Sequence, residues 1–369
     1  MSKRLTSIAS ILLIGGLALT GCSASGTDSA SSTSEAESSS ASTSDSVSVT
    51  NCGEEKTYPR TTRLVVNDGN ITSVALAAGA YDNIVGVSSL QRDESIIALR
   101  YGDKVHDLNQ ISEKYWNLEN ILSVDPQTAF AGWGYGFRES DGLTPADLDT
   151  HGISTYLLSE TCRQGGSQAR GTMDPWTALN TDIENIAKIA GDEDAANKEI
   201  ADINARRTAI EEAPQAEKTP VTFLFDSPND STVFSSGAFG APQAIFDSAG
   251  VENALSDVQD TWVDVSWERI TSADPDIIFF VDYPPVELDE KIAALEANPA
   301  TKDLKAVKEK RYVNLPYAMW TSGPLNIDGL EYVRYALEHY GLQPESGIKP
   351  KLDITQLDLP GNEWLKEAK

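Results

Sequence analysis

Histidine is scarce in this chain, and the motifs of common hydrolases are missing. Only three histidines occur, His106, His151 and His339. His151 stands at an expected helix end and His339 closes a late helix, so both fit helix C-terminal cations better than zinc or manganese ligands. The chain has no G-x-S-x-G turn, no H-x-x-E-H pair and no Walker loop. We therefore expect a protein that is not an enzyme and that carries no resident metal or cofactor.

Positive charge is also in short supply. The chain has 29 Lys and Arg residues against 56 Asp and Glu residues, which gives a formal net charge of -27. Such a chain repels polyanions, so nucleic acid is not expected as a partner. The acidity itself fits solubility in a salty exterior and says little about a ligand.

Long hydrophobic runs are limited to the N-terminus. Lys3 and Arg4 precede an apolar run at residues 8–19, which is too short to span a bilayer as a mature helix. We predict a signal peptide at 1–21. The Leu-Thr-Gly sequence before Cys22 resembles the bacterial lipobox, which implies a diacylated cysteine at the mature N-terminus. The chain is then expected at the extracytoplasmic face of the cell membrane, held by a lipid anchor.

A polar tether is expected next, at residues 22–50. It consists almost entirely of Ser, Ala, Thr, Asp and Glu, which bury too little apolar surface to offset the entropy of ordering. Roughly 320 residues follow, which is more than one hydrophobic core usually accommodates. The length therefore predicts two lobes beyond a disordered, lipidated tether.

Cysteine is as scarce as histidine. Of the three cysteines, lipidation of Cys22 leaves Cys52 and Cys162 as a pair in a compartment that permits disulfides. We predict that the two are bridged, with two free thiols as the alternative.

Apolar β-rich runs alternate with helical patterns through the rest of the chain. The first runs lie at 63–66, 84–87, 128–131 and 154–157, and the rhythm restarts at 221–225, 276–281 and 312–315. This alternation predicts an α/β protein of two lobes, each a mostly parallel sheet covered by helices. The expected parts are an N-terminal lobe at 51–175, connecting helices at 176–213, a C-terminal lobe at 214–345 and an extension at 346–369. The second connecting helix, about 20 residues long, is expected to join the lobes on its own.

Two segments carry the most specific motifs. The first is Trp-Asn-Leu-Glu-Asn-Ile at 116–121 with Asp-Pro at 125–126, and the second is Val-Ser-Trp-Glu at 265–268 with Ala-Asp-Pro-Asp at 273–276. Together they resemble the ferric-siderophore and cobalamin class of ABC-transporter substrate-binding proteins, over about residues 60–340. The resemblance implies that Glu119 and Glu268 dock on the two subunits of an ABC permease dimer. Their alternative role is stabilisation of the first turn of a helix. We expect the protein itself to be a monomer.

Ligands of open α/β sheets bind beyond the carboxyl ends of the strands. Here these positions are rich in aromatic side chains, which suit a bulky conjugated or chelate ligand. Arginines near the same ends can bind anionic oxygens. The resemblance adds weight to Trp262, which matches a cleft tryptophan of the cobalamin-binding members. The residues expected to contact ligand are Trp133, Tyr135, Arg163, Trp262, Tyr283 and Trp320.

The ligand expected first is a ferric siderophore. Cobalamin, haem or a deazaflavin-type cofactor precursor are the alternatives within transport, and a surface adhesin without a ligand is the alternative outside it. No residue of the sequence decides among them.

Overall fold

The computed structural model describes residues 46–367. The predicted signal peptide, Cys22 and the tether up to residue 45 lie outside this range. The described chain opens with an antiparallel hairpin of β1 (Ser46–Asn51) and β2 (Glu54–Pro59). Residues 46–50 were expected in the tether, but their Ser-Val-Ser-Val alternation has the period of a strand, and Val49 is buried in the core. The tether boundary is corrected accordingly.

The first lobe is built on a parallel sheet of strand order β5-β4-β3-β6, in which both β7 and β8 also pair with β6. Its central strand, of sequence Leu-Val-Val-Asn, is buried along its whole length because helices cover both faces. The strands are β3 (Leu64–Asn67), β4 (Ile84–Ser88), β5 (Gln110–Ser112), β6 (Thr128–Trp133), β7 (Gly136–Phe137) and β8 (Ser154–Leu157). The helices are α1 (Gly69–Ala77), α2 (Glu94–Tyr101), α3 (Leu118–Leu122) and α4 (Pro145–Asp149), with short 3-10 turns at Tyr81–Asn83, Asp103–Asp107, Glu139–Asp141 and Ser159–Thr161.

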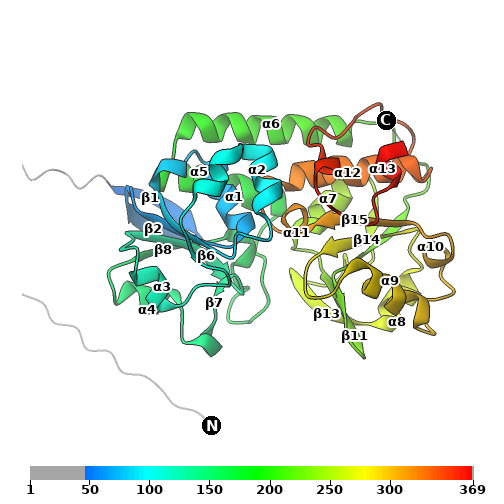
Figure 1. The fold of residues 1–369 in the computed structure, drawn as a ribbon, viewed down its shortest axis with the longest axis horizontal. Helices are drawn as coiled ribbons and strands as arrows, with labels where there is room; N and C mark the ends of the chain where they lie inside the picture. The colour runs from blue at the N-terminus through cyan, green and yellow to red at the C-terminus, as the bar shows by residue number, and fades with distance from the viewer. Residues whose placement is uncertain (1–45, 368–369) are drawn as a thin grey trace, which may run out of the picture. The chain divides into compact units, whose positions relative to one another are not determined.

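Two helices lead out of this lobe. The first is α5 (Pro175–Ala190), which begins with Pro175 and with Asp174 as its cap, and the second is α6 (Glu193–Glu211), capped by Asp192. With 19 residues, α6 is about 28 Å long. It packs on α5 and α1 of the first lobe and on α7 and α12 of the second, and Figure 1 shows it running along both sheets. The prediction of one long helix joining two α/β lobes is confirmed.

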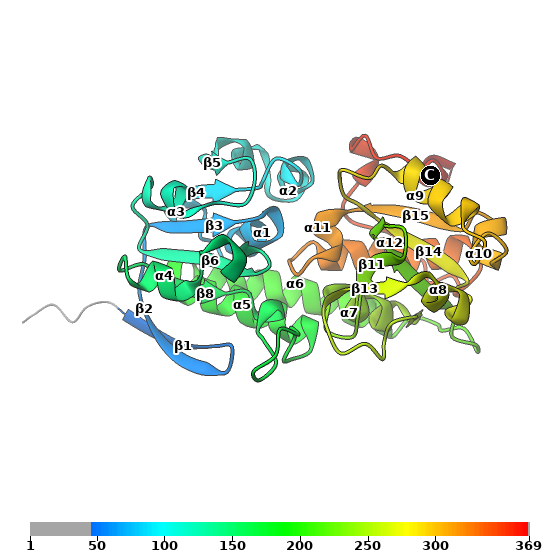
Figure 2. The same ribbon diagram turned by 90° about the horizontal axis from the view of Figure 1, so that it is seen from below.

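The second lobe combines two sheets. A parallel sheet has the order β12-β9-β14-β15, and an antiparallel sheet, which the sequence did not predict, has the order β10-β11-β13. The strands are β9 (Val221–Phe225), β10 (Ser227–Pro228), β11 (Thr232–Ser236), β12 (Glu252–Asn253), β13 (Trp262–Ser266), β14 (Ile277–Asp282) and β15 (Tyr312–Pro316). The helices are α7 (Ala241–Ala249), α8 (Trp267–Ala273), α9 (Leu288–Ala297), α10 (Lys305–Lys308), α11 (Tyr317–Trp320), α12 (Asn326–His339) and α13 (Trp364–Glu367), with a 3-10 turn at Ile354–Gln356. Figure 2 shows these elements gathered at one end of α6.

The segment after α12 packs back on the second lobe. The Tyr332 hydroxyl donates to the backbone oxygen of Leu352 at 2.6 Å, and Ile354, Trp364 and Leu365 are buried in the same core. The expected C-terminal extension thus covers the second lobe. Within residues 46–367, no helix has the length and apolar character that crossing a membrane requires.

A buried ion cluster joins α2, α6 and α12. The Arg206 guanidinium donates to Glu331 through Nε and Nη2, both at 2.7 Å, and Nη2 also reaches Asp328 at 2.6 Å. Asp328 also pairs with Arg100, which in turn pairs with Glu199. Because α2 belongs to the first lobe and α12 to the second, the cluster fastens both lobes to the connecting helix.

Candidate functional site

A cavity of about 360 Å³ lies between the two lobes. Four of its lining residues come just after the ends of parallel strands: Tyr135 after β6, Asp226 after β9, Tyr283 after β14 and Tyr317 after β15. The carboxyl ends of both parallel sheets therefore meet at one place, which is where open α/β sheets bind ligands.

Six of the fourteen residues that line the cavity are aromatic. Trp262, at the start of β13, stacks on Phe234 of β11 with ring centroids 5.9 Å apart. The rings of Tyr283 and Tyr317 lie 4.7 Å apart. Trp262 is only 7% exposed, and its buried indole N–H lies beside the carboxyl group of Glu160.

Three guanidinium groups lie over tyrosine rings of this wall. Arg138 is 5.4 Å from the ring of Tyr115, and Arg170 is 5.8 Å from that of Tyr135. Arg92 lies 4.3 Å from the Tyr283 ring, behind the wall. The flat faces of the rings hold these cations in place, and their donors give the cavity a strong capacity for anionic oxygens.

Buried carboxyl groups stand beside the same wall. Asp68 is fully buried at the N-terminus of α1, where it accepts from the Tyr115 hydroxyl at 2.8 Å. Burial raises the pKa of Asp93 to about 8 and that of Glu160 to about 7. Burial also raises the pKa of Asp226, which lines the cavity. At neutral pH the acidic side of this site is therefore partly protonated.

Three of the six residues expected to contact ligand line the cavity: Tyr135, Trp262 and Tyr283. Trp320 does not, because its side chain is fully buried between Phe246 and Phe279. It follows a strand end as Tyr317 does, but the helical turn α11 buries its ring in the core. We therefore remove Trp320 from the set of ligand contacts.

Trp133 and Arg163 are also outside the cavity wall. The Arg163 guanidinium lies 3.8 Å from the Trp133 ring and pairs with Glu139, its Nη2 and Oε2 atoms being 3.0 Å apart. Trp133 packs edge-on against Phe137, at a centroid distance of 6.3 Å. These two residues form a stacked surface pair beside the site rather than part of it.

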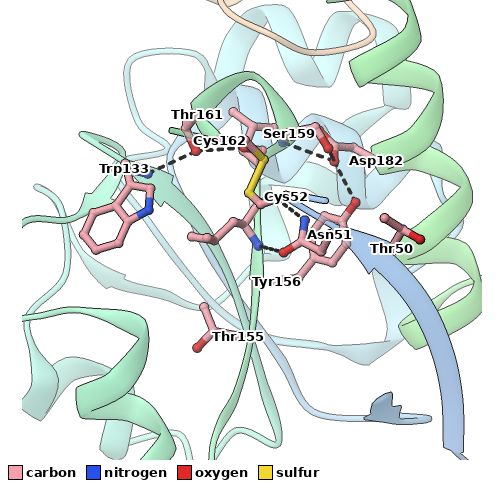
Figure 3. The surroundings of a disulfide bond; sticks show 12 residues. Thr50, Asn51, Cys52, Trp133, Thr155, Tyr156, Ser159, Thr161, Cys162 and Asp182 are labelled. Carbon is pink, nitrogen blue, oxygen red and sulfur yellow. Dashed lines mark hydrogen bonds between the residues drawn. A yellow bond between two sulfur atoms is a disulfide. The ribbon is translucent and has the colours of Figure 1, made fainter. Parts of the chain in front are cut away.

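The structure joins Cys52 and Cys162 in a disulfide. Figure 3 shows it next to the turn that begins at Ser159. The side chain of Asn51, at the hairpin tip, accepts from Leu157 N at 2.9 Å and donates to Leu157 O at 2.7 Å. The hairpin and the disulfide thus fix the segment after β8, which carries Glu160.

Several site residues were missed by the sequence reasoning. Asp68 directly follows β3, and Glu160 comes three residues after β8, so the strand-end rule could have found both. Arg92 and Tyr115 lie in loops and turns that no strand pattern marks. For Asp68 and Glu160 the sequence did offer a signal, which was an acidic residue shortly after a buried strand.

Glu119 and Glu268 lie on different lobes, in α3 and α8, and both are exposed. A capping box between Asn117 and Asn120 holds the start of α3. Figure 1 shows α3 and α8 on the side of the two sheets away from α6. Among residues 46–367, no three His, Cys, Asp or Glu side chains are grouped to hold a metal ion.

Comparison with known proteins gives a consistent picture. The model of a family described as periplasmic binding protein matches residues 64–318. A vitamin B12-binding protein of Vibrio campbellii is 22% identical over 209 residues, 56% of this chain and 66%, just under two thirds, of that protein. A periplasmic binding protein from Veillonella parvula superposes with a TM-score of 0.66 at 21% identity, covering 83% of this chain and 99% of its own. An ABC-type Fe3+-hydroxamate transport system from Saccharomonospora viridis gives 0.64 at 20% identity, covering 79% and 98%.

Proposed function

Because the chain belongs to the periplasmic binding protein family, whose members are binding proteins rather than enzymes, we propose that it captures a compact ferric siderophore and delivers it to an ABC importer. The observation that carries this proposal is the cavity between the lobes. Aromatic rings line it and guanidinium groups of Arg138 and Arg170 stand in its wall. Such a wall offers flat apolar surface to the organic part of a chelate and charged donors to its oxygens.

The size of the cavity supports a compact ligand. Small-molecule sites usually range from about 300 to 1,000 Å³, so 360 Å³ lies near the lower end. Cobalamin is bulkier and would require the lobes to move apart further. The family relation to a vitamin B12-binding protein keeps cobalamin as an alternative.

Haem is less well supported by the chemistry of the cavity tyrosines. A tyrosine binds ferric haem iron through its oxygen, and ligation is easiest when the phenol loses its proton readily. Burial raises the pKa of Tyr135 and Tyr317 well above the usual range, so both stay protonated. They are better suited to donating hydrogen bonds to a ligand than to binding iron themselves.

The proposed delivery step uses the outer surface. Glu119 and Glu268, one on each lobe, are proposed to pair with basic residues of the two permease subunits. Because the two exposed carboxylates lie on different lobes, the distance between them depends on the relative position of the lobes. Pairing of both with the permease can therefore depend on that position. The proposed anchor is the lipidated Cys22, which would keep the protein at the extracytoplasmic membrane surface.

The experiment is a tryptophan-fluorescence and thermal-shift titration of the full chain. The probes are ferric hydroxamate and catecholate siderophores, with cobalamin and haem for comparison. Saturable quenching with a rise in melting temperature is expected for a ferric siderophore. A response to cobalamin or haem alone would overturn the substrate and keep the transport role, and silence across the panel would favour the adhesin alternative.

Matched variants locate the site. Arg170→Gln removes a guanidinium of the cavity wall, and we expect the dissociation constant to rise roughly 10- to 100-fold, the loss of one charge-assisted hydrogen bond. Arg163→Gln removes a guanidinium that stacks on Trp133 outside the wall, and should leave affinity within about threefold. Equal losses in both variants would place the ligand elsewhere.

A further inference from the structure

Residues 317–322 of the second lobe lie against the first lobe beside the cavity. They follow β15, form the turn α11 and bring Tyr317 into the cavity wall. Asn70 of α1 donates to the backbone oxygen of Ser322 at 2.9 Å, and both residues are buried. This segment, called the 317–322 segment below, is therefore one of the points where the second lobe touches the first next to the ligand cavity.

Glu160 of the first lobe holds one end of this segment. Its Oε2 accepts from the backbone N–H of Ser322 at 3.1 Å. The side chain is 2% exposed, and its Oε1 has no hydrogen-bond partner. The indole of Trp262 and the guanidinium of Arg170 face the same carboxyl group and lower its pKa, but burial outweighs them and raises it to about 7.

Asp93 and Asp68 face the other end of the segment. The Ala318 backbone N–H interacts with the Asp93 carboxyl group, whose Oδ2 has no hydrogen-bond partner. The Tyr317 hydroxyl lies 3.4 Å from Asp68 Oδ2. Three buried carboxyl groups of one lobe thus meet six consecutive residues of the other.

The charges around these groups do not neutralise them fully. Arg92 is the cation that faces both Asp68 and Asp93, at 4.0 Å from Asp68 Oδ1. Asp68 and Asp282 face Asp93 as like charges and raise its pKa further, beyond the effect of burial. Asp182 is an acidic neighbour of Glu160 and raises its pKa in the same way. The charge of Glu160 in turn raises the pKa of the Tyr135 hydroxyl. Because one guanidinium can balance the charge of only one carboxylate, the second of the two carboxyl groups is favoured in its protonated form.

We propose that Asp93 and Glu160 are positioning residues that hold the 317–322 segment against the first lobe while they are protonated, so that opening of the cavity is coupled to proton release. The contacts concern the lobes themselves and do not depend on which ligand the cavity takes. A carboxyl group with an unpartnered buried oxygen is stable when neutral and strongly disfavoured when charged. Opening exposes both groups to water, where they ionise freely.

The direction of the pH effect follows from the raised pKa values. The closed form binds more protons than the open form, because opening returns each pKa toward its usual range near 4. Closure is therefore fully stabilised below about pH 4, weakens as the pH rises, and levels off above about 7 for Glu160 and about 8 for Asp93. Alkaline conditions favour an open cavity.

The test is amide hydrogen exchange of the ligand-free full chain, read by mass spectrometry on peptides covering the 317–322 segment. Protection, corrected for the intrinsic pH dependence of exchange, reports the opening equilibrium. Between about pH 6 and pH 9, linkage predicts a loss of protection of about 10-fold from Glu160 and about 100-fold from Asp93, because the closed form of Asp93 keeps its proton to a higher pH. Peptides of β14 serve as the internal reference for global unfolding.

Single-residue variants show which carboxyl group causes the pH-dependent loss of protection. Glu160→Gln keeps an oxygen that accepts from Ser322 but cannot ionise, so the roughly 10-fold component should vanish, and Asp93→Asn should remove the larger, roughly 100-fold one. The matched control is Asp182→Asn: this buried acid also has a pKa raised to about 7, but it bonds only Ser159 and Tyr156 of its own lobe (Figure 3). Asp182 is the weakest of the neighbours that shift the Glu160 pKa, so the pH response of this variant should stay close to that of the unmodified protein. Protection that does not change with pH in the unmodified protein, or an undiminished response in Glu160→Gln, would overturn the proposal.

Discussion

Two sets of buried charges hold the lobes of this protein together, and they are built in opposite ways. The cluster on α6 pairs each acid with a guanidinium: Arg206 binds Asp328 and Glu331, and Arg100 binds Asp328 from the other lobe. The set beside the cavity leaves oxygens of Asp93 and Glu160 without partners. Paired charges hold their geometry over a wide pH range, whereas unpartnered acids respond to protons. The comparison suggests a fixed attachment along α6 and an adjustable one at the ligand cavity.

Breaking the fixed attachment should have the largest effect. Asp328→Ala leaves two buried guanidinium groups without this acceptor, and we expect the free energy of unfolding to fall by about 5 kcal/mol. Asp202→Ala is the control, because Asp202 pairs with the same Arg206 from a position that is 44% exposed. It should lower stability by less than about 1 kcal/mol. Urea unfolding measures both, and equal effects would show that the cluster is not the main attachment.

Removing the disulfide tests whether it supports the adjustable attachment beside the ligand cavity. Replacing Cys52 and Cys162 by serine opens a loop with a sequence separation of 110 residues, and we expect stability to fall by about 4 kcal/mol. The segment carrying Glu160 should lose protection from hydrogen exchange before α6 does. A uniform loss across the chain would mean that the disulfide supports both attachments alike.

The smallest expected effect is the dependence of overall stability on pH. Burial raises the pKa of Asp182 to about 7 and that of Glu160 to about 7, so the folded state binds protons that the unfolded state has already released. The free energy of unfolding should therefore fall by about 1 to 2 kcal/mol per carboxyl group between about pH 6 and pH 8. Urea titrations at both pH values check this, with Asp182→Asn losing its share. A rise in stability over this range would contradict the assignment of neutral buried acids.

The sequence predicted the architecture well because hydrophobic periodicity reports burial. Runs such as Leu-Val-Val-Asn at β3 and the apolar face of α5 mark the strands and helices that bury them. The antiparallel sheet of β10, β11 and β13 was missed because two of its strands are half-exposed and carry mixed residues. Short exposed strands have little periodicity to read.

Only part of the site was predicted, because a local sequence pattern does not report how a loop folds back. Position after a strand correctly brought Tyr135 and Tyr283 to the cavity, and the family resemblance brought Trp262. Position alone could not tell Tyr317 from Trp320, three residues later in one helical turn. Nor could it distinguish Arg170, which stacks on a cavity tyrosine, from Arg163, which stacks on Trp133. Those differences depend on how a loop folds back, which is set by contacts far apart in the chain.

The most direct test of the ligand proposal is to locate iron in the molecule. Crystals of the full chain grown with a ferric hydroxamate siderophore, and measured at the iron absorption edge, would show the metal by its anomalous scattering. The account predicts one strong peak inside the cavity between Tyr135 and Trp262, with Arg170 directed at the chelate. Well-ordered crystals from a solution saturated with the complex, with no iron peak in that cavity, would contradict it.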